Sequence, residues 1–261
     1  MATLEEFLRT NGIQTATFQV LFGEGAETMY YLSTDGESAI ELWRKLRGLV
    51  LESGYWPVVL GGREELDRHL ESLAGNTETS TEAILESSRS IDGEEWLRYT
   101  YENIYDSDED EEDSYPRGQW PSDSKPDDRF TIPYKGEWIA SEQRMEYEPL
   151  PVVYVALVPT RVSWQVPAYL KAGGWNYCPV PEEHCAVLRY WEDGYGAEIV
   201  GMSFDTFELQ VARPPESRES ALELAQEQFA YCPDIVEQGV ETIEALAATL
   251  LNGRVWLFWW D

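Results

Sequence analysis

The chain has 261 residues, of which 43% are hydrophobic and 13% aromatic, enough for a core in one large or two small domains. It carries 49 acidic and 19 basic residues, a formal net charge of −30. Nucleic acids and anionic membranes repel such a chain, so we expect neither as a partner. No apolar run of about 18 residues predicts a transmembrane helix. The first residues lack a signal-peptide pattern, so we expect a cytoplasmic protein with three thiol cysteines.

Residues 1–75 predict a small N-terminal α/β segment. Thr3 and Glu6 form the pattern of a capping box at the start of a short helix. Apolar residues at spacings of three and four then predict a helix that opens after Asp35-Gly36. The elements expected here are helices over 4–9, 37–52 and 64–73 and strands over 17–22, 28–32 and 56–60.

Residues 76–150 predict an acidic, partly disordered linker region. Residues 76–149 hold 21 acidic and 7 basic side chains, nearly half of the excess negative charge. Seven carboxylates crowd into 106–113: Asp106, Asp108, Glu109, Asp110, Glu111, Glu112 and Asp113. Such a run is expected to stay solvated, so we interpret 104–128 as a loop or linker. The aromatic residues from Trp96 to Tyr105 predict a short docked helix before it.

Residues 151–261 predict a C-terminal domain. The closing sequence Trp256-Leu257-Phe258-Trp259-Trp260-Asp261 is too apolar for an exposed tail, so we expect a buried last strand. The predicted elements are strands over 152–158, 197–202, 206–212 and 255–260, helices over 181–191, 217–229 and 243–250, and a glycine-rich loop over 173–179. This order predicts an α+β fold, with a mixed or mainly antiparallel sheet covered by helices and a smaller N-terminal α/β segment.

The region contains several short motifs: Ala156-Leu157-Val158-Pro159-Thr160, Gly173-Gly174-Trp175-Asn176, Tyr195-Gly196-Ala197-Glu198, Val211-Ala212-Arg213-Pro214-Pro215, Tyr231-Cys232-Pro233-Asp234 and Phe258-Trp259-Trp260-Asp261. Together they resemble DUF4253, a bacterial family of uncharacterised proteins. The resemblance covers about 152–261 and implies one C-terminal domain from a bacterial cytosol. It implies no reaction, because the family is uncharacterised.

Cys178 is the candidate nucleophile, because it lies in a glycine-rich loop just before a predicted helix N-terminus. His184 follows six residues later, and Asp205 or Asp234 could orient its ring, as in acyl-transfer enzymes. The alternative is that the thiol and the imidazole only pack in the fold. Cys178, His184, Cys185 and Cys232 lack the spacing of a zinc site, so we expect no metal and no cofactor.

A ligand pocket at the aromatic loop is a second hypothesis, with Trp175, Asn176 and Arg213 as the binding residues and Trp164 nearby. The alternatives are that the Trp rings belong to the core, and that Arg213 pairs with an internal carboxylate, Asp234 or Asp261.

The sequence thus favours two functions. The first is a non-enzymatic acidic interaction protein, such as an immunity- or inhibitor-type protein, that binds a basic protein partner through the 106–113 carboxylates. Its plain alternative is that the charge serves solubility. The second is a small-molecule-binding protein or a hydrolase- or transferase-like enzyme with its site at the Gly-Gly-Trp-Asn-Tyr-Cys loop.

Overall fold

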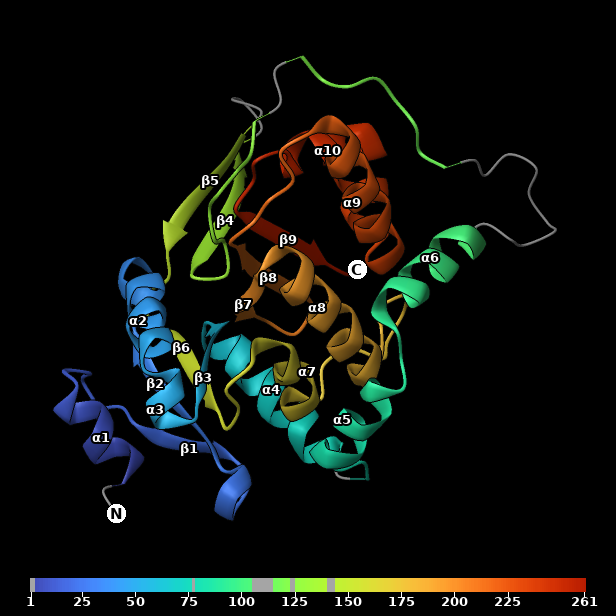
Figure 1. Cartoon of the computed structure of the whole chain (residues 1–261). Coiled ribbons are helices and arrows are strands. Elements are labelled where there is room, and N and C mark those ends of the chain that lie inside the picture. Colours follow the sequence, from blue (N-terminus) through green and yellow to red (C-terminus); the bar gives the residue numbers. More distant parts are fainter. Residues whose placement is uncertain (1–2, 77, 105–114, 123–124, 140–143) are drawn as a thin grey trace.

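The computed structural model describes residues 3–76, 78–104, 115–122, 125–139 and 144–261. A mixed seven-stranded sheet runs through it in the order β1-β2-β6-β3-β7-β8-β9 (Figure 1). Its strands are β1 (Gln19–Phe22), β2 (Met29–Thr34), β3 (Trp56–Gly61), β6 (Val153–Val158), β7 (Ala197–Met202), β8 (Thr206–Val211) and β9 (Val255–Trp259). Every neighbouring pair is antiparallel except β3 and β7, which are parallel. The predicted α+β fold with a mixed sheet is therefore confirmed.

The helices mostly follow the predicted segments. They are α1 (Leu4–Thr10), α2 (Gly36–Gly48), α3 (Val50–Ser53), α4 (Arg63–Gly75), α5 (Thr81–Arg89), α6 (Gly93–Asn103), α7 (Val166–Leu170), α8 (Pro181–Tyr195), α9 (Arg218–Tyr231) and α10 (Ile243–Leu250), with short turns η1 (Gly25–Glu27), η2 (Ser163–Gln165) and η3 (Ile235–Val240). The helix expected over 37–52 is divided at Leu49, directly after Gly48. Glycine favours the helical state least among residues other than proline, which suits such an end.

The N-terminal segment and the C-terminal region share one sheet. Strand β6 lies between β2 and β3 and pairs with both, for example Leu32 with Val155 and Val58 with Ala156. The N-terminal segment therefore packs directly on the C-terminal region. The last strand completes the sheet on β8, and its Trp256 and Phe258 side chains are buried, as expected from the aromatic ending.

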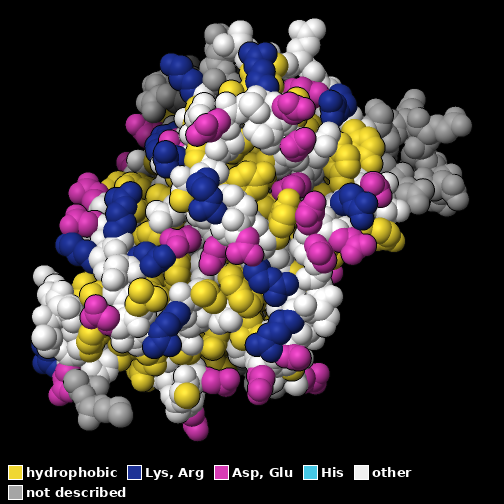
Figure 2. Space-filling view, in the orientation of Figure 1, with side chains coloured by type: hydrophobic (Ala, Val, Ile, Leu, Met, Phe, Trp, Pro, Cys, Tyr) yellow, Lys and Arg dark blue, Asp and Glu magenta, His cyan; other side chains and the backbone are white. Residues whose placement is uncertain are grey.

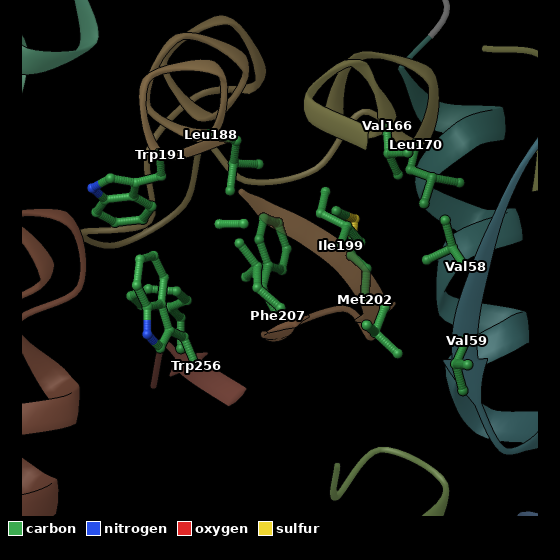
Figure 3. Close-up of a cluster of buried hydrophobic side chains, with 14 of the residues drawn as sticks. Val58, Val59, Val166, Leu170, Leu188, Trp191, Ile199, Met202, Phe207 and Trp256 are labelled. Atoms are coloured by element: carbon green, nitrogen blue, oxygen red, sulfur yellow. The ribbon is translucent and has the colours of Figure 1, made fainter. Parts of the chain in front are cut away.

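The core lies between the sheet and the helices that cover it. Helix α2 packs on β2, β3 and β6, whereas α7 and α8 lie on the other side of the sheet (Figure 1). On the α8 side, Leu188 and Trp191 meet Phe207 and Trp256 of the sheet (Figure 3). The Trp191 and Trp256 rings meet edge to face at 5.6 Å. Elsewhere, acidic and basic side chains are interspersed on the face drawn in Figure 2.

The middle region holds more regular structure than a linker predicts. Helix α5 begins after Ser80, whose hydroxyl accepts the N–H of Ala83, and α6 confirms the short helix expected there. A separate hairpin, β4 (Tyr134–Ile139) with β5 (Arg144–Pro149), was not predicted from the sequence. Residues 115–122 and 125–128 form no helix or strand, and the 106–113 carboxylates lie outside the described residues.

In the part of the chain that the structure describes, none of the helices has the length and apolar character needed to span a membrane.

Candidate functional site

The carboxyl ends of β3 and β7 meet at one edge of the sheet. The two strands run parallel, with Val59 opposite Gly201. Helix α4 follows β3 at once, and the turn 203–205 follows β7. In sheets with parallel strands, this edge is where ligands commonly bind, because helix starts and loops converge on it.

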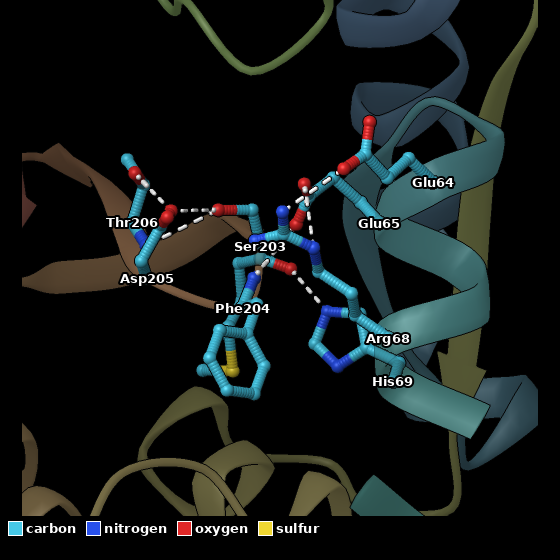
Figure 4. Close-up of polar contacts among 9 residues, drawn as sticks. Glu64, Glu65, Arg68, His69, Ser203, Phe204, Asp205 and Thr206 are labelled. Carbon is cyan, nitrogen blue, oxygen red and sulfur yellow. Dashed lines mark hydrogen bonds and ion pairs between the residues drawn. The ribbon is translucent and has the colours of Figure 1, made fainter. Parts of the chain in front are cut away.

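Three contacts hold helix α4 against the last residue of β7 and the turn that follows it (Figure 4). The carboxylate of Glu65 accepts the N–H of Phe204 at 3.1 Å. The Nε2 atom of His69 lies 3.0 Å from the carbonyl oxygen of Met202, so Nε2 carries the proton and donates it. The guanidinium of Arg68 lies over the Phe204 ring, 5.9 Å from its centroid. Burial lowers the pKa of His69 to about 4, so its ring is neutral at pH 7.

A groove lies between α4 and the glycine-rich loop; we call it the edge groove. Two adjoining cavities of about 380 Å³ and 360 Å³ form it, and they share Asn76, Lys171 and Gly173. The Trp175 and Phe204 rings stack at its wall, 5.5 Å apart and 7° from parallel. The groove therefore offers an aromatic surface at the carboxyl ends of β3 and β7.

Lys171 brings a cation to this groove. Its backbone is left-handed, with φ of 52° at the end of α7. Its ammonium donates to the carbonyl of Thr79 at 2.9 Å and to the hydroxyl of Thr81 at 3.4 Å, which ties α5 to the loop. Partial burial lowers the pKa of this ammonium.

The loop over 173–179 folds on two left-handed glycines. Gly173 and Gly174 have φ of +86° and +83°, and the N–H of Gly174 donates to the carbonyl of Pro179. A Cβ on Gly173 would lie 1.9 Å from that same oxygen and 2.6 Å from Nε2 of His184. Only glycine permits this approach, so the loop covers the His184 ring directly.

Cys178 of this loop, together with His184 and Tyr231, forms a buried chain of hydrogen-bonding groups. The Cys178 Sγ lies 3.5 Å from His184 Nε2, and His184 Nδ1 lies 2.5 Å from the Tyr231 hydroxyl. His184 also contacts the rings of Phe207 and Trp260. The structure thus brings the first two candidate catalytic residues together and adds Tyr231, which the sequence did not single out.

All three groups are neutral in this environment. Burial raises the pKa of the Cys178 thiol to about 12, and it lowers the pKa of His184 to about 3. Burial also raises the pKa of Tyr231 well above its ordinary value. Nucleophilic attack requires a thiolate, and Cys178 is only 6% exposed. The geometry is that of a packed polar chain in an aromatic core.

The carboxylates expected to orient His184 serve other groups. Asp205 accepts the hydroxyls of Ser203 and Thr206 within its own turn, at 3.0 and 2.9 Å. Asp234 accepts the backbone N–H of Asp261 at 2.9 Å. The Tyr231 hydroxyl occupies the place that the sequence assigned to a carboxylate, because α9 ends beside the imidazole.

The predicted ligand set of Trp175, Asn176 and Arg213 is not gathered in one place. Trp175 lines the edge groove, whereas the Asn176 amide donates to the carbonyl of Asp261. The Arg213 guanidinium donates to carbonyls at the end of α8, including that of Asp193 at 2.8 Å. The expected pairing of Arg213 with Asp234 or Asp261 is therefore wrong: helix carbonyls left without partners attract the guanidinium instead.

Two further candidates remain outside this site. Trp164 is half-buried beneath the guanidinium of Arg189. The carboxylates of 106–113 lie outside the described residues. Among the residues that are described, no three His, Cys, Asp or Glu side chains are grouped to hold a metal ion.

Comparison with protein families finds a match for the C-terminal region. Residues 154–261 match the family model described as a domain of unknown function, DUF4253. The resemblance inferred from the motifs is thereby confirmed. Searches of curated proteins and of solved structures find no match.

The DUF4253 region begins in β6, but its sheet includes strands from outside it. Strand β3 lies between β6 and β7, so the match does not cover a contiguous half of the sheet. The edge groove combines Trp175 and Phe204 of the DUF4253 region with Arg68 and His69 of α4. Sequence reasoning missed the last two because only the pairing of β3 with β7 brings them there. Gly61-Gly62, between an apolar strand and a charged helix, was the one local signal.

Proposed function

We propose that this protein is a non-enzymatic interaction protein that binds a basic protein partner, as an immunity- or inhibitor-type protein does. The observation that carries the proposal is the excess of carboxylates, since the chain has 49 acidic and only 19 basic side chains. Many of these cations are already used within their own helices, as in Lys45–Glu41 and Arg63–Asp67. The remaining surplus creates a negative field, which speeds the capture of a positively charged protein.

The buried thiol supports the non-enzymatic part of the proposal. The strongest catalytic candidate, Cys178, is neutral and only 6% exposed. Three buried cysteines without a disulfide also suit the reducing cytoplasm that we propose as the location of the protein.

The test is affinity capture from a lysate of the host with an N-terminally tagged protein, eluted with a salt gradient. The key variant carries Asn or Gln at the seven acidic positions of 106–113. The matched control neutralises seven other carboxylates, on α2, α4, α5 and the segment between α4 and α5: Glu37, Glu41, Glu64, Glu71, Glu78, Glu82 and Glu86. We expect one stoichiometric basic partner, released by salt and bound about tenfold more weakly by the key variant. A partner that resists salt and binds both variants equally would refute the proposal.

A second candidate function is the binding of a small planar ligand in the edge groove. The stacked Trp175 and Phe204 at the carboxyl edge of β3 and β7 favour it. Ligand-observed NMR with a library of aromatic carboxylates tests it, comparing Trp175→Ala with Tyr177→Ala. Tyr177 is 82% exposed and serves as the control. Hits lost only in Trp175→Ala support a ligand site, and hits that both variants retain contradict it.

A further inference from the structure

A second pocket lies at the other end of β7, beside Gly196. Its cavity has a volume of about 550 Å³. Three arginines from distant parts of the chain line it: Arg44 on α2, Arg213 after β8 and Arg254 before β9. We infer that this arginine pocket binds a small multivalent oxyanion, a molecule that carries phosphate or carboxylate groups.

Arg213 is held in a defined position. Its Nε and Nη2 donate to carbonyls of the last turn of α8, namely Asp193 at 2.8 Å, Gly194 at 3.3 Å and Glu192 at 3.4 Å. The Nη1 end lies against Gly196, where an added Cβ would come within 3.1 Å. Gly196 itself lines the cavity. The fork is therefore pre-organised, and its Nη1 end borders the pocket.

Arg254 is anchored to the same corner. Its Nη1 donates to the carbonyl of Ala212 at 3.3 Å, next to Arg213 in the chain. Its backbone N–H donates to the carboxylate of Asp128 at 2.6 Å. Two arginines that follow and precede neighbouring strands thus line the pocket at the end of β8, and Arg44 contributes a third from α2.

The carboxylates of the pocket wall are already engaged. Glu198 forms a two-point ion pair with Arg47, whose Nε lies 3.0 Å from Oε2, and it also accepts the Gln210 amide at 3.3 Å. Arg47 in turn stacks on Trp56 at 4.5 Å. The Asp128 carboxylate accepts the backbone of Arg254. Arg47 offsets the charge of Glu198, so among the lining residues only the Asp128 carboxylate is set against the three arginines, and the wall keeps a net positive charge.

Three arginines in one pocket are unusual in this chain, because its basic residues are few. Residues 150–261 contain only six basic side chains, and two of them line this pocket. A net charge of −30 repels anions from the surface in general, so an anion can bind only where the local electrostatic potential is positive. Arginine forks match the geometry of phosphate and carboxylate groups. Phe130, Val211 and Val255 add an apolar wall, which suits an organic part of the ligand.

The test is isothermal titration of the full chain with pyrophosphate and, separately, with citrate in chloride buffer. The key variants are Arg44→Gln and the double variant Arg44→Gln/Arg254→Gln. The control is Lys45→Gln, which removes the same charge one position along α2 outside this pocket. Circular dichroism and Tm confirm that each variant is folded.

We expect one equivalent of at least one probe to bind. Affinity should fall about tenfold or more in the double variant, measurably in Arg44→Gln, and less than about twofold in Lys45→Gln. Binding of pyrophosphate alone assigns a phosphate-bearing ligand, and binding of citrate alone assigns a carboxylate-bearing one. No binding of either probe, or an equal loss in Lys45→Gln and Arg44→Gln, would overturn the inference.

Discussion

The Nδ1 atom of His184 and the hydroxyl oxygen of Tyr231 lie 2.5 Å apart at the centre of the aromatic core. Both side chains are buried, and their rings meet nearly at right angles. This bond joins α8 to the end of α9. The contact between the Cys178 Sγ and the His184 Nε2 links both helices to the glycine-rich loop.

Removal of the Tyr231 hydroxyl should destabilise the protein. Tyr231→Phe leaves the buried Nδ1 of His184 without its partner, which costs about 1–3 kcal/mol in the free energy of unfolding. Urea denaturation at pH 7 measures the loss. Tyr177→Phe removes an exposed hydroxyl, from a side chain 82% exposed, and should change stability by less than about 0.5 kcal/mol. Equal effects of the two substitutions would contradict this role for the bond.

Cys178 should resist alkylation in the folded protein. Its pKa of about 12 and its burial leave almost no accessible thiolate at pH 8. Iodoacetamide labelling, mapped by mass spectrometry, should modify Cys178 no faster than Cys185 and Cys232, and all three should react once urea unfolds the chain. Rapid labelling of Cys178 alone would instead revive its assignment as a nucleophile.

Glu208 should make stability depend on pH. This side chain of β8 is 1% exposed; its Oε1 accepts hydrogen bonds from Thr131 and Ile132, and its Oε2 has no hydrogen-bond partner among the residues that the structure describes. Burial raises the pKa of this carboxyl above the ordinary value of 4.5. The folded state thus favours the protonated form, so the contribution of Glu208 is complete below pH 4.5 and is lost as pH rises through the raised pKa.

Glu208→Gln tests that sign. The amide keeps an acceptor for Thr131 and cannot ionise, so the variant should be more stable than the parent at pH 8, by about 1 kcal/mol or more. The advantage should shrink toward pH 4. Urea denaturation at the two pH values gives the difference. An advantage that grows as pH falls would show that the carboxylate is stabilised in the fold.

Gly173→Ala should disrupt the loop over His184. The new Cβ would overlap the Pro179 carbonyl oxygen at 1.9 Å, and φ of +86° strains any L side chain. We expect a loss of about 3 kcal/mol or more, or failure to fold. Gly48→Ala is the control, because outside its own helix no described residue lies within 4 Å of its Cβ position, and it should stabilise slightly. Thermal unfolding of both variants decides; a Tm of Gly173→Ala near the parent value would contradict the clash.

Local patterns could be recognised without the structure. The alternation and helical spacing of apolar residues located most strands and helices, and Asp35, Thr3 and Pro181 marked helix starts, because these signals act within one element. The β4–β5 hairpin was not predicted, because charged residues such as Lys135, Glu137 and Glu146 interrupt its apolar positions and it pairs outside the seven-stranded sheet.

The sequence by itself determined the acidic charge, the local elements, the aromatic last strand and the DUF4253 motifs. The tertiary structure decided everything that depends on which strands are neighbours. The parallel pairing of β3 with β7 brings His69 to Met202, and the ends of β7, β8 and β9 bring Arg213 and Arg254 together near Arg44. Long-range pairing reflects the packing of the whole core, and a spacing along the chain does not encode it. The polar partner of His184 also depended on where α9 ends in space.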